Sequence, residues 1–168
     1  MNRAIAKFEK VSFEQFFKDT MDTFGMLDNT IEETYKNIKL PKRATTGSAG
    51  YDFYSPIDFE LKPGETIKIP TGIRCLMDKN WVLQIYPRSG LGFKYQINLC
   101  NEVGIVDSDY SNSDNEGHIF IKLVNRGDKP VTINFGEAFA QGIFLPYGIT
   151  VDDDTEGIRN GGFGSTGR

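Results

Sequence analysis

The sequence predicts an all-β fold, a barrel or a sandwich, with a helical segment near the N-terminus. From residue 39 onward, short apolar or alternating runs recur, and turn-forming residues separate them. Before that point, aromatic residues recur at helical spacing instead. Strands that alternate with long helices, as in a parallel sheet, are not visible. The length of 168 residues fits one domain over residues 1–168 with a hydrophobic core.

The helical segment covers residues 12–37. Its apolar residues follow the helical period: Phe13, Phe16, Phe17, Met21 and Phe24. Ser12 and Gln15 match a capping box, and Gly25 is expected to end the helix. A second short helix is expected over residues 30–35. The segment either packs on the β-rich part as an amphipathic layer or docks a protein partner.

Five later runs are expected to be strands: residues 66–69, 81–86, 118–124, 131–134 and 138–146. Turn-forming clusters bound them: residues 62–65, 78–80, 125–128 and 135–136. His118 is the only histidine of the chain and is expected to open its strand. A mechanism that needs two or three histidines within one chain is therefore excluded.

Composition and charge restrict the class of protein further. The net charge of −4 provides no basic field for nucleic acid, so a polyphosphate ligand would need local cations or a metal ion. Cys75 and Cys100 lack metal-ligand spacing and lie within or beside apolar runs. Reduced, buried thiols are expected, which is typical of a cytoplasmic protein. No signal peptide or long apolar span is visible, so no membrane association is expected.

The last ten residues, 159–168, combine glycines with Phe163, two hydroxyl residues and an arginine at each end. Glycine allows backbone N–H groups to approach an anion closely, and arginine suits phosphate oxygens. The stretch therefore predicts a phosphate-binding segment with a ring for stacking, which indicates a nucleotide ligand. Residues 162–167 also match G-x-G-x-x-G, but a dinucleotide fold needs that match between a strand and a helix. A frayed, glycine-rich terminus is the alternative interpretation.

Five polar, glycine-marked clusters interrupt the strands: residues 48–52, 87–92, 101–110, 135–141 and the tail. In this order and spacing they resemble the five motifs of the trimeric dUTPase family, over residues 40–167. Pro-Arg-Ser-Gly, Val-Asp-Ser-Asp-Tyr and Gly-Phe-Gly-Ser-Thr-Gly are each intact. The resemblance implies a jelly-roll (β-clip) subunit, a homotrimer with shared active sites, and hydrolysis of dUTP to dUMP and pyrophosphate with Mg²⁺.

The third motif carries the residues that the resemblance assigns to the nucleoside and the α-phosphate. Asp107 is implied to be the general base that aligns water for attack on the α-phosphorus. Asn101, with backbone groups and Gly104, would bind uracil, and Tyr110 would pack under deoxyribose, where a 2′-OH would clash. Taken without the resemblance, Asp107 fits a polar turn, Asn101 a turn cap and Tyr110 an aromatic on the sheet surface.

Three further motifs are implied to hold the phosphates and the metal ion. The resemblance assigns Arg88, Ser89 and Gly90, together with Gln141, to the phosphate chain. It assigns Asp52 to Mg²⁺ through water, which suits a cation that keeps several of its waters. The alternatives are a surface turn with a solvated arginine and an outward-facing glutamine on an apolar strand.

The tail is implied to be a mobile lid over residues 158–168 that reaches the site of a neighbouring subunit. Its substrate-binding residues are Phe163, Gly164, Ser165 and Thr166. The phenylalanine would stack on uracil, and the other three would close on the phosphates. Either Arg159 or Arg168 would meet the γ-phosphate.

Three features depart from the family pattern. Segment 12–37 is expected to be an insertion. The loop after Tyr110 is longer than the usual tight turn, with Asp114 and Glu116 expected to face solvent. Ala138 replaces a frequent arginine. Deamination of dCTP on the same fold is an alternative activity, and a regulatory, protein-binding role of the insertion is an alternative of another class.

Overall fold

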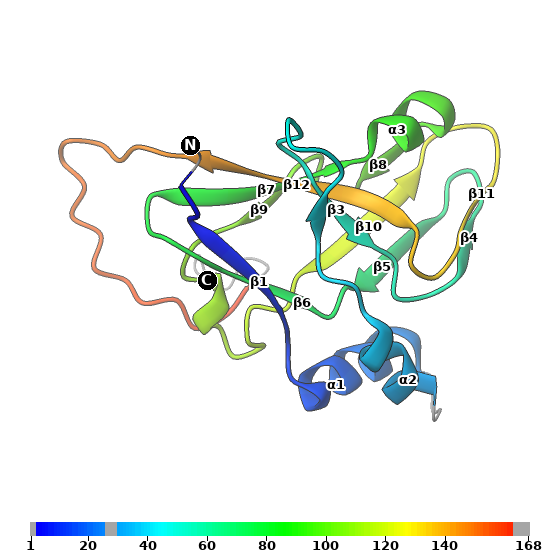
Figure 1. The fold of residues 1–168 in the computed structure, drawn as a ribbon, viewed down its shortest axis with the longest axis horizontal. Helices are drawn as coiled ribbons and strands as arrows, with labels where there is room; N and C mark the ends of the chain where they lie inside the picture. Colours follow the sequence, from blue (N-terminus) through cyan, green and yellow to red (C-terminus); the bar gives the residue numbers. More distant parts are fainter. Residues whose placement is uncertain (1–2, 26–29, 163–168) are drawn as a thin grey trace.

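The computed structural model describes residues 3–25 and 30–162. This part of the chain is mostly β, with three α-helices and one 3-10 turn (Figure 1). The strands are β1 (Ala6–Lys10), β2 (Lys42–Arg43), β3 (Tyr51–Tyr54), β4 (Phe59–Leu61), β5 (Thr66–Pro70), β6 (Ile73–Met77), β7 (Trp81–Pro87), β8 (Ile97–Leu99), β9 (Gly104–Val106), β10 (Phe120–Asn125), β11 (Val131–Ile133) and β12 (Ala138–Pro146). The helices are α1 (Phe13–Phe24), α2 (Thr30–Asn37) and α3 (Ser89–Tyr95), and the turn is η1 (Tyr110–Asn112).

Strand β12 is the centre of the largest sheet, whose order is β2-β3-β12-β7-β9. Its pairings are antiparallel, and Gln141 on β12 lies opposite Asp52 on β3 and Tyr86 on β7. A second sheet has the order β5-β10-β8, and two ribbons pair β1 with β6 and β11 with β4. Many of these neighbours are far apart in sequence, so the sheets form only when distant segments meet. Each of the five expected runs overlaps one of these strands, which confirms that part of the prediction.

The hydrophobic core joins the sheets, because alternate residues of each strand point to the same side. In β10, Ile121 and Leu123 are buried and Lys122 between them is exposed. Phe53 from β3 and Phe139 from β12 are buried in the same cluster. Most polar residues of the motifs lie in turns or at strand ends, outside this core, whereas Asp52 and Gln141 lie within β3 and β12.

Helices α1 and α2 lie together at one end of the molecule, below the strands in Figure 1. Ser12 is the N-cap of α1 and accepts a hydrogen bond from the Gln15 amide at 3.1 Å, as the capping pattern predicts. Gly25 ends the helix in the left-handed conformation, with φ of 63°, which glycine adopts without strain. Phe16 and Ile31 are buried in the common core, so both helices pack on the β-rich part of the chain.

Two helical features differ from the expectation. Helix α2 continues two residues beyond the expected end at residue 35, to Asn37. Helix α3 was not expected at all, because Gly90 and Gly92 lower helix propensity and the motif resembles a loop. It forms because Arg88 leaves β7 in an extended conformation, and Gln96 closes the helix with φ of 54°.

Three predictions about single side chains are wrong. His118 does not open a strand, since β10 begins at Phe120 and His118 is fully buried in the turn before it. Asp114 is exposed as predicted, but Glu116 is half-buried, because its carboxylate accepts two hydrogen bonds from Ser12. Cys75 is buried, and burial raises the pKa of its thiol to about 12, but Cys100 is only half-buried. Among the described helices, none is long and apolar enough to cross a membrane.

Candidate active site

The described motif residues gather in two places. A cavity of about 600 Å³ is lined by Asn101, Gly104, Asp107, Tyr110 and Arg159. A second cavity, of about 640 Å³, has Arg88, Ser89 and Gly90 at its rim. No described residue lines both cavities. One chain therefore presents two separate parts of the predicted site, which are called the base side and the phosphate side below.

The base side begins in the tight turn between β8 and β9. The Glu102 amide donates to the Leu99 carbonyl at 3.1 Å, and Glu102 has φ of 61°. This turn leaves the Asn101 side chain exposed at the cavity. A Cβ at Gly104 would lie 3.0 Å from the Cβ of Ile85, so glycine lets β9 approach β7 closely.

Asp107 and Tyr110 are joined by the backbone turn that follows β9. The Tyr110 amide donates to the Asp107 carbonyl at 3.1 Å. The Tyr110 hydroxyl donates to the carbonyl of His118 at 2.8 Å and accepts from the side-chain amide of Asn115 at 3.0 Å. Burial raises the pKa of Tyr110, so the phenol stays protonated near neutral pH. The ring is thus held at both its backbone and its hydroxyl.

Arg159 brings the tail onto this turn. Its guanidinium forms an ion pair with Asp107 through Nη2 and another with Asp109 through Nε, the second at 2.8 Å. A Cβ at Gly162 would lie 2.6 Å from the Tyr110 ring, so only glycine allows the tail to lie this close to the ring. In Figure 1 the segment after β12 runs around one end of the sheets before it returns to this place. Asp109 has a role that its motif position alone did not reveal.

The phosphate side forms where β7 ends. Arg88 precedes α3, and Ser89 and Gly90 form the first turn of that helix, where backbone N–H groups lack intrahelical partners. Arg88 Nε lies 3.2 Å from Oδ1 of Asp52, which joins β7 to β3 through a charge pair. Gln141 donates from Nε2 to the Pro87 carbonyl at 3.0 Å. These polar groups therefore surround the end of β7.

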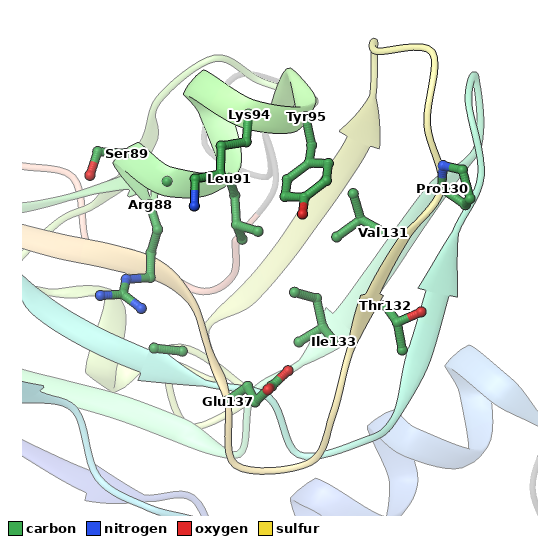
Figure 2. A pocket seen from close by; sticks show the side chains of 12 residues that line it. Arg88, Ser89, Leu91, Lys94, Tyr95, Pro130, Val131, Thr132, Ile133 and Glu137 are labelled. Carbon is green, nitrogen blue, oxygen red and sulfur yellow. The ribbon is translucent and has the colours of Figure 1, made fainter.

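Figure 2 shows the cavity beside these residues. Leu91 and Tyr95 point from α3 toward Val131 and Ile133, whereas Arg88 points away from that apolar part. The polar motif residues lie at the rim, and the interior of the cavity is formed by α3 and β11. Ala138 also lines it, at the position where the resemblance leads one to expect arginine.

Two groups of predicted binding residues remain: Asp52, which is the candidate for the metal ion, and the residues of the tail. Among the described residues, no group of three or more histidine, cysteine or acidic side chains could hold a metal ion. Asp52 is a single carboxylate, a hard oxygen donor paired with Arg88, and such a donor fits a magnesium ion held through water. The other tail ligands lie outside the described residues: Phe163, Gly164, Ser165, Thr166 and Arg168.

Comparison with known proteins identifies the family of this chain. The family model described as dUTPase matches residues 36–167. The deoxyuridine 5'-triphosphate nucleotidohydrolase of Lactococcus lactis is 44% identical over 138 residues, which cover 79% of this chain and 92% of the relative. A crystal structure of dUTPase from Streptococcus mutans has a TM-score of 0.63 and 33% identity, and covers 87% of this chain and 98% of that one.

A solved structure of lower sequence identity has the same fold. A dUTPase variant from phage phi11 of S. aureus has a TM-score of 0.65 at 18% identity, with 92% of this chain and 98% of that chain covered. The family match and the nucleotidohydrolase relatives show that this mostly β chain is a nucleotide hydrolase. The chain belongs to the dUTPase family.

Proposed function

We propose that this chain hydrolyses dUTP to dUMP and pyrophosphate, with Asp107 as the general base. The observation that carries the proposal is the cavity shared by Asp107, Asn101, Gly104 and Tyr110. It combines a carboxylate, a side-chain amide and a fixed aromatic ring, as a nucleoside with an adjacent phosphate requires. The family match and the nucleotidohydrolase relatives support the same activity.

In the proposed reaction, Asp107 takes a proton from water as the water oxygen attacks the α-phosphorus. The bond from that phosphorus to the oxygen bridging toward the β-phosphorus breaks, which leaves dUMP and pyrophosphate. A side chain 48% exposed, as that of Asp107 is, has access to water. In the described structure Arg159 pairs with this carboxylate, and with triphosphate bound its fork would serve the γ-phosphate instead.

Substrate choice would rest on the other base-side residues. The exposed amide of Asn101 would donate to the O4 carbonyl of uracil, with Gly104 allowing the backbone to contact the same base. Cytosine has an amine at that position, which would leave the amide unpaired. Tyr110 would exclude a 2′-OH, because its ring cannot retreat while its hydroxyl is held.

The phosphates would bind Arg88, the first turn of α3 at Ser89 and Gly90, and Gln141. Mg²⁺ bound to the triphosphate would reach Asp52 through water and neutralise phosphate charge. Phe163, Gly164, Ser165 and Thr166 would close over the nucleotide as part of the lid formed by residues 158–168. These assignments follow the motif resemblance.

We further propose a jelly-roll subunit, one domain over residues 1–168, and a homotrimer with shared active sites in the cytoplasm. The separation of the base side from the phosphate side supports sharing, because neither cavity of one chain contains both sets of residues. Two chains that set one base side against another phosphate side would complete a site.

Pyrophosphate release from dUTP, dCTP, dTTP and UTP, each with and without Mg²⁺, tests the proposal. We expect rapid release from dUTP alone, and only with the metal ion. Equal release from dCTP or UTP would contradict the assigned pocket. Release of ammonia from dCTP would support the alternative activity of deamination.

A regulatory, protein-binding role of residues 12–37 is a second candidate. The family match begins at residue 36, so α1 lies outside the matched part. Phe16 is in the core, but Phe17 on the same helix is 40% exposed. Partner capture by the wild type and by Phe17→Glu compares the exposed face without removing the core residue. Identical captured partners would count against this role.

A further inference from the structure

The loop between Tyr110 and His118 joins the proposed base side to helix α1. Tyr110 begins η1 at the cavity, and His118 lies fully buried next to the helix. The loop is longer than its family pattern suggests, and its two ends are tied together by the Tyr110 hydroxyl and the His118 carbonyl. Contacts that fix the position of His118 therefore also restrict Tyr110.

His118 is held by contacts on both ring nitrogens. Its Nε2 accepts the Gly72 amide at 2.7 Å, so the proton of the neutral ring is assigned to Nδ1. Nδ1 lies 2.5 Å from Oδ2 of Asp19 on α1, and Gln15 donates to the same oxygen at 2.8 Å. A ring satisfied in this way in the core has one orientation, and that orientation depends on α1.

Glu116 supplies a second connection to the same helix. Its carboxylate accepts from the Ser12 amide at 2.7 Å and from the Ser12 hydroxyl at 2.6 Å. A negative charge is favourable at this N-terminal end of α1. Glu116 adopts φ of 59°, a conformation that costs free energy for a residue other than glycine, so the contact with Ser12 holds the loop in an otherwise unfavourable shape.

Close packing inside the loop transmits this constraint. A Cβ at Gly117 would lie 2.6 Å from Cα of Ser111 and 2.8 Å from the Tyr110 carbonyl. The His118 amide donates to the Asn115 carbonyl at 3.0 Å, and the Asn115 side chain in turn donates to the Tyr110 hydroxyl. The close packing at Gly117 and these hydrogen bonds couple the two ends of the loop.

We propose that Asp19 and Glu116 are positioning residues. They attach the loop of residues 110–118 to α1, hold Tyr110 in place through that loop, and so set the discrimination of the site between deoxyribose and ribose. This inference rests on the proposed function of the base side. Neither residue lines the cavity, and each acts through the loop. Without the Asp19–His118 contact or the Glu116–Ser12 contact, the Tyr110 ring can move away from the sugar. The site then admits the 2′-OH of UTP and binds dUTP less tightly.

The test measures kcat/KM for dUTP and UTP in Asp19→Ala and Glu116→Ala, with Asp22→Ala, at an exposed acidic position of α1, as the matched control. The dUTP-to-UTP ratio should fall about tenfold or more in both variants, mainly through KM for dUTP, because a small misplacement of a positioning group is costly. Asp19→Asn and Glu116→Gln retain an acceptor oxygen and should restore most of the ratio. An unchanged ratio in the alanine variants, or an equal loss on both nucleotides, would overturn the inference.

Hydrogen–deuterium exchange of residues 110–118 provides a readout that needs no activity. Exchange should rise in Asp19→Ala and Glu116→Ala and stay unchanged in Asp22→Ala. Unchanged exchange in both alanine variants would overturn the inference even if the wild type hydrolyses dUTP. If exchange rises but the wild type releases no pyrophosphate from dUTP, the proposed function fails while the coupling of the loop to α1 stands. If Asp19→Ala does not fold, Glu116→Ala, at a half-buried residue, decides alone.

Discussion

Asp107 and Arg159 show how one contact affects the proposed chemistry. The carboxylate is half-exposed, and the guanidinium that pairs with it comes from the tail. Asp109 shares the same guanidinium, so the arginine is held from two sides. A triphosphate would have to compete with both carboxylates for Arg159, which ties the position of the tail to the occupation of the site.

Asp107→Asn removes the proposed base and keeps the size of the side chain. We expect the variant to fold and to bind dUTP, while kcat falls by about 10²–10⁴-fold, because that is what a positioned base contributes. Pyrophosphate release and equilibrium binding of dUTP measure the two effects separately. Turnover close to that of the wild type would contradict the assignment of Asp107.

Asp19 predicts a pH dependence of stability. Burial opposes ionisation of this carboxyl, but the hydrogen bonds from His118 and Gln15 outweigh it and hold the pKa below its ordinary value of 3.8. A pKa depressed by folding stabilises the native state above the unfolded-state value, and that stabilisation is lost as the pH falls through the folded-state value.

The free energy of unfolding of the wild type should therefore exceed that of Asp19→Ala near neutral pH. The excess should shrink below about pH 4, since the carboxyl is then protonated first in the unfolded state, and it is lost once the pH falls below the folded-state pKa. Urea unfolding of both proteins at a series of pH values measures this difference. A difference that is constant across the acid range would show that the ionised form of Asp19 adds nothing.

Some features of an element are set by residues nearby in the sequence, and others by residues far away. The end residues of α1 follow directly from the sequence, because Ser12, Gln15 and Gly25 act within a few residues of one another. The contact of Ser12 with Glu116 joins residues 104 positions apart, and no local pattern contains it. The ends of α1 can thus be predicted from the sequence, whereas its contact with the loop at Glu116 cannot.

Removal of the tail is expected to leave the fold intact and to abolish function. Ile158 and Val151 are exposed, and no described tail residue belongs to the core cluster. Deletion of residues 159–168 should leave the melting temperature nearly unchanged and abolish most of the hydrolysis of dUTP, because the proposed lid and Arg159 are lost. Thermal unfolding and pyrophosphate release measure both, with Arg159→Ala as the variant that isolates the arginine. Full activity of the truncated chain would remove the lid from the proposal.

At the scale of the whole molecule, the two separate cavities make a prediction about mixed assemblies. Asp107→Asn would lack the proposed base and Arg88→Ala a proposed phosphate ligand, so each alone should be nearly inactive. Subunits exchanged between the two variants would form some sites with both residues intact, because in the proposed shared site Asp107 and Arg88 would come from different chains. Activity should therefore reappear after unfolding and refolding the variants together.

Refolding each variant separately is the control, and the mass of the wild-type assembly should be that of a trimer. A mixture no more active than its parts would place a complete site within one chain. A monomeric mass would have the same consequence.

The sequence by itself determined the chemistry available to this protein. Its helical period near the N-terminus, its short strands and its five polar clusters led to a mostly β fold and to the dUTPase family, because these patterns depend on neighbours within a few residues. The tertiary structure decided which distant residues meet. It buried His118 against Asp19, turned Glu116 onto Ser12, made a helix of residues 89–95, and separated Asp107 from Arg88. Such contacts depend on close packing of segments far apart in the chain, and the periodicity of neighbouring residues does not predict that packing.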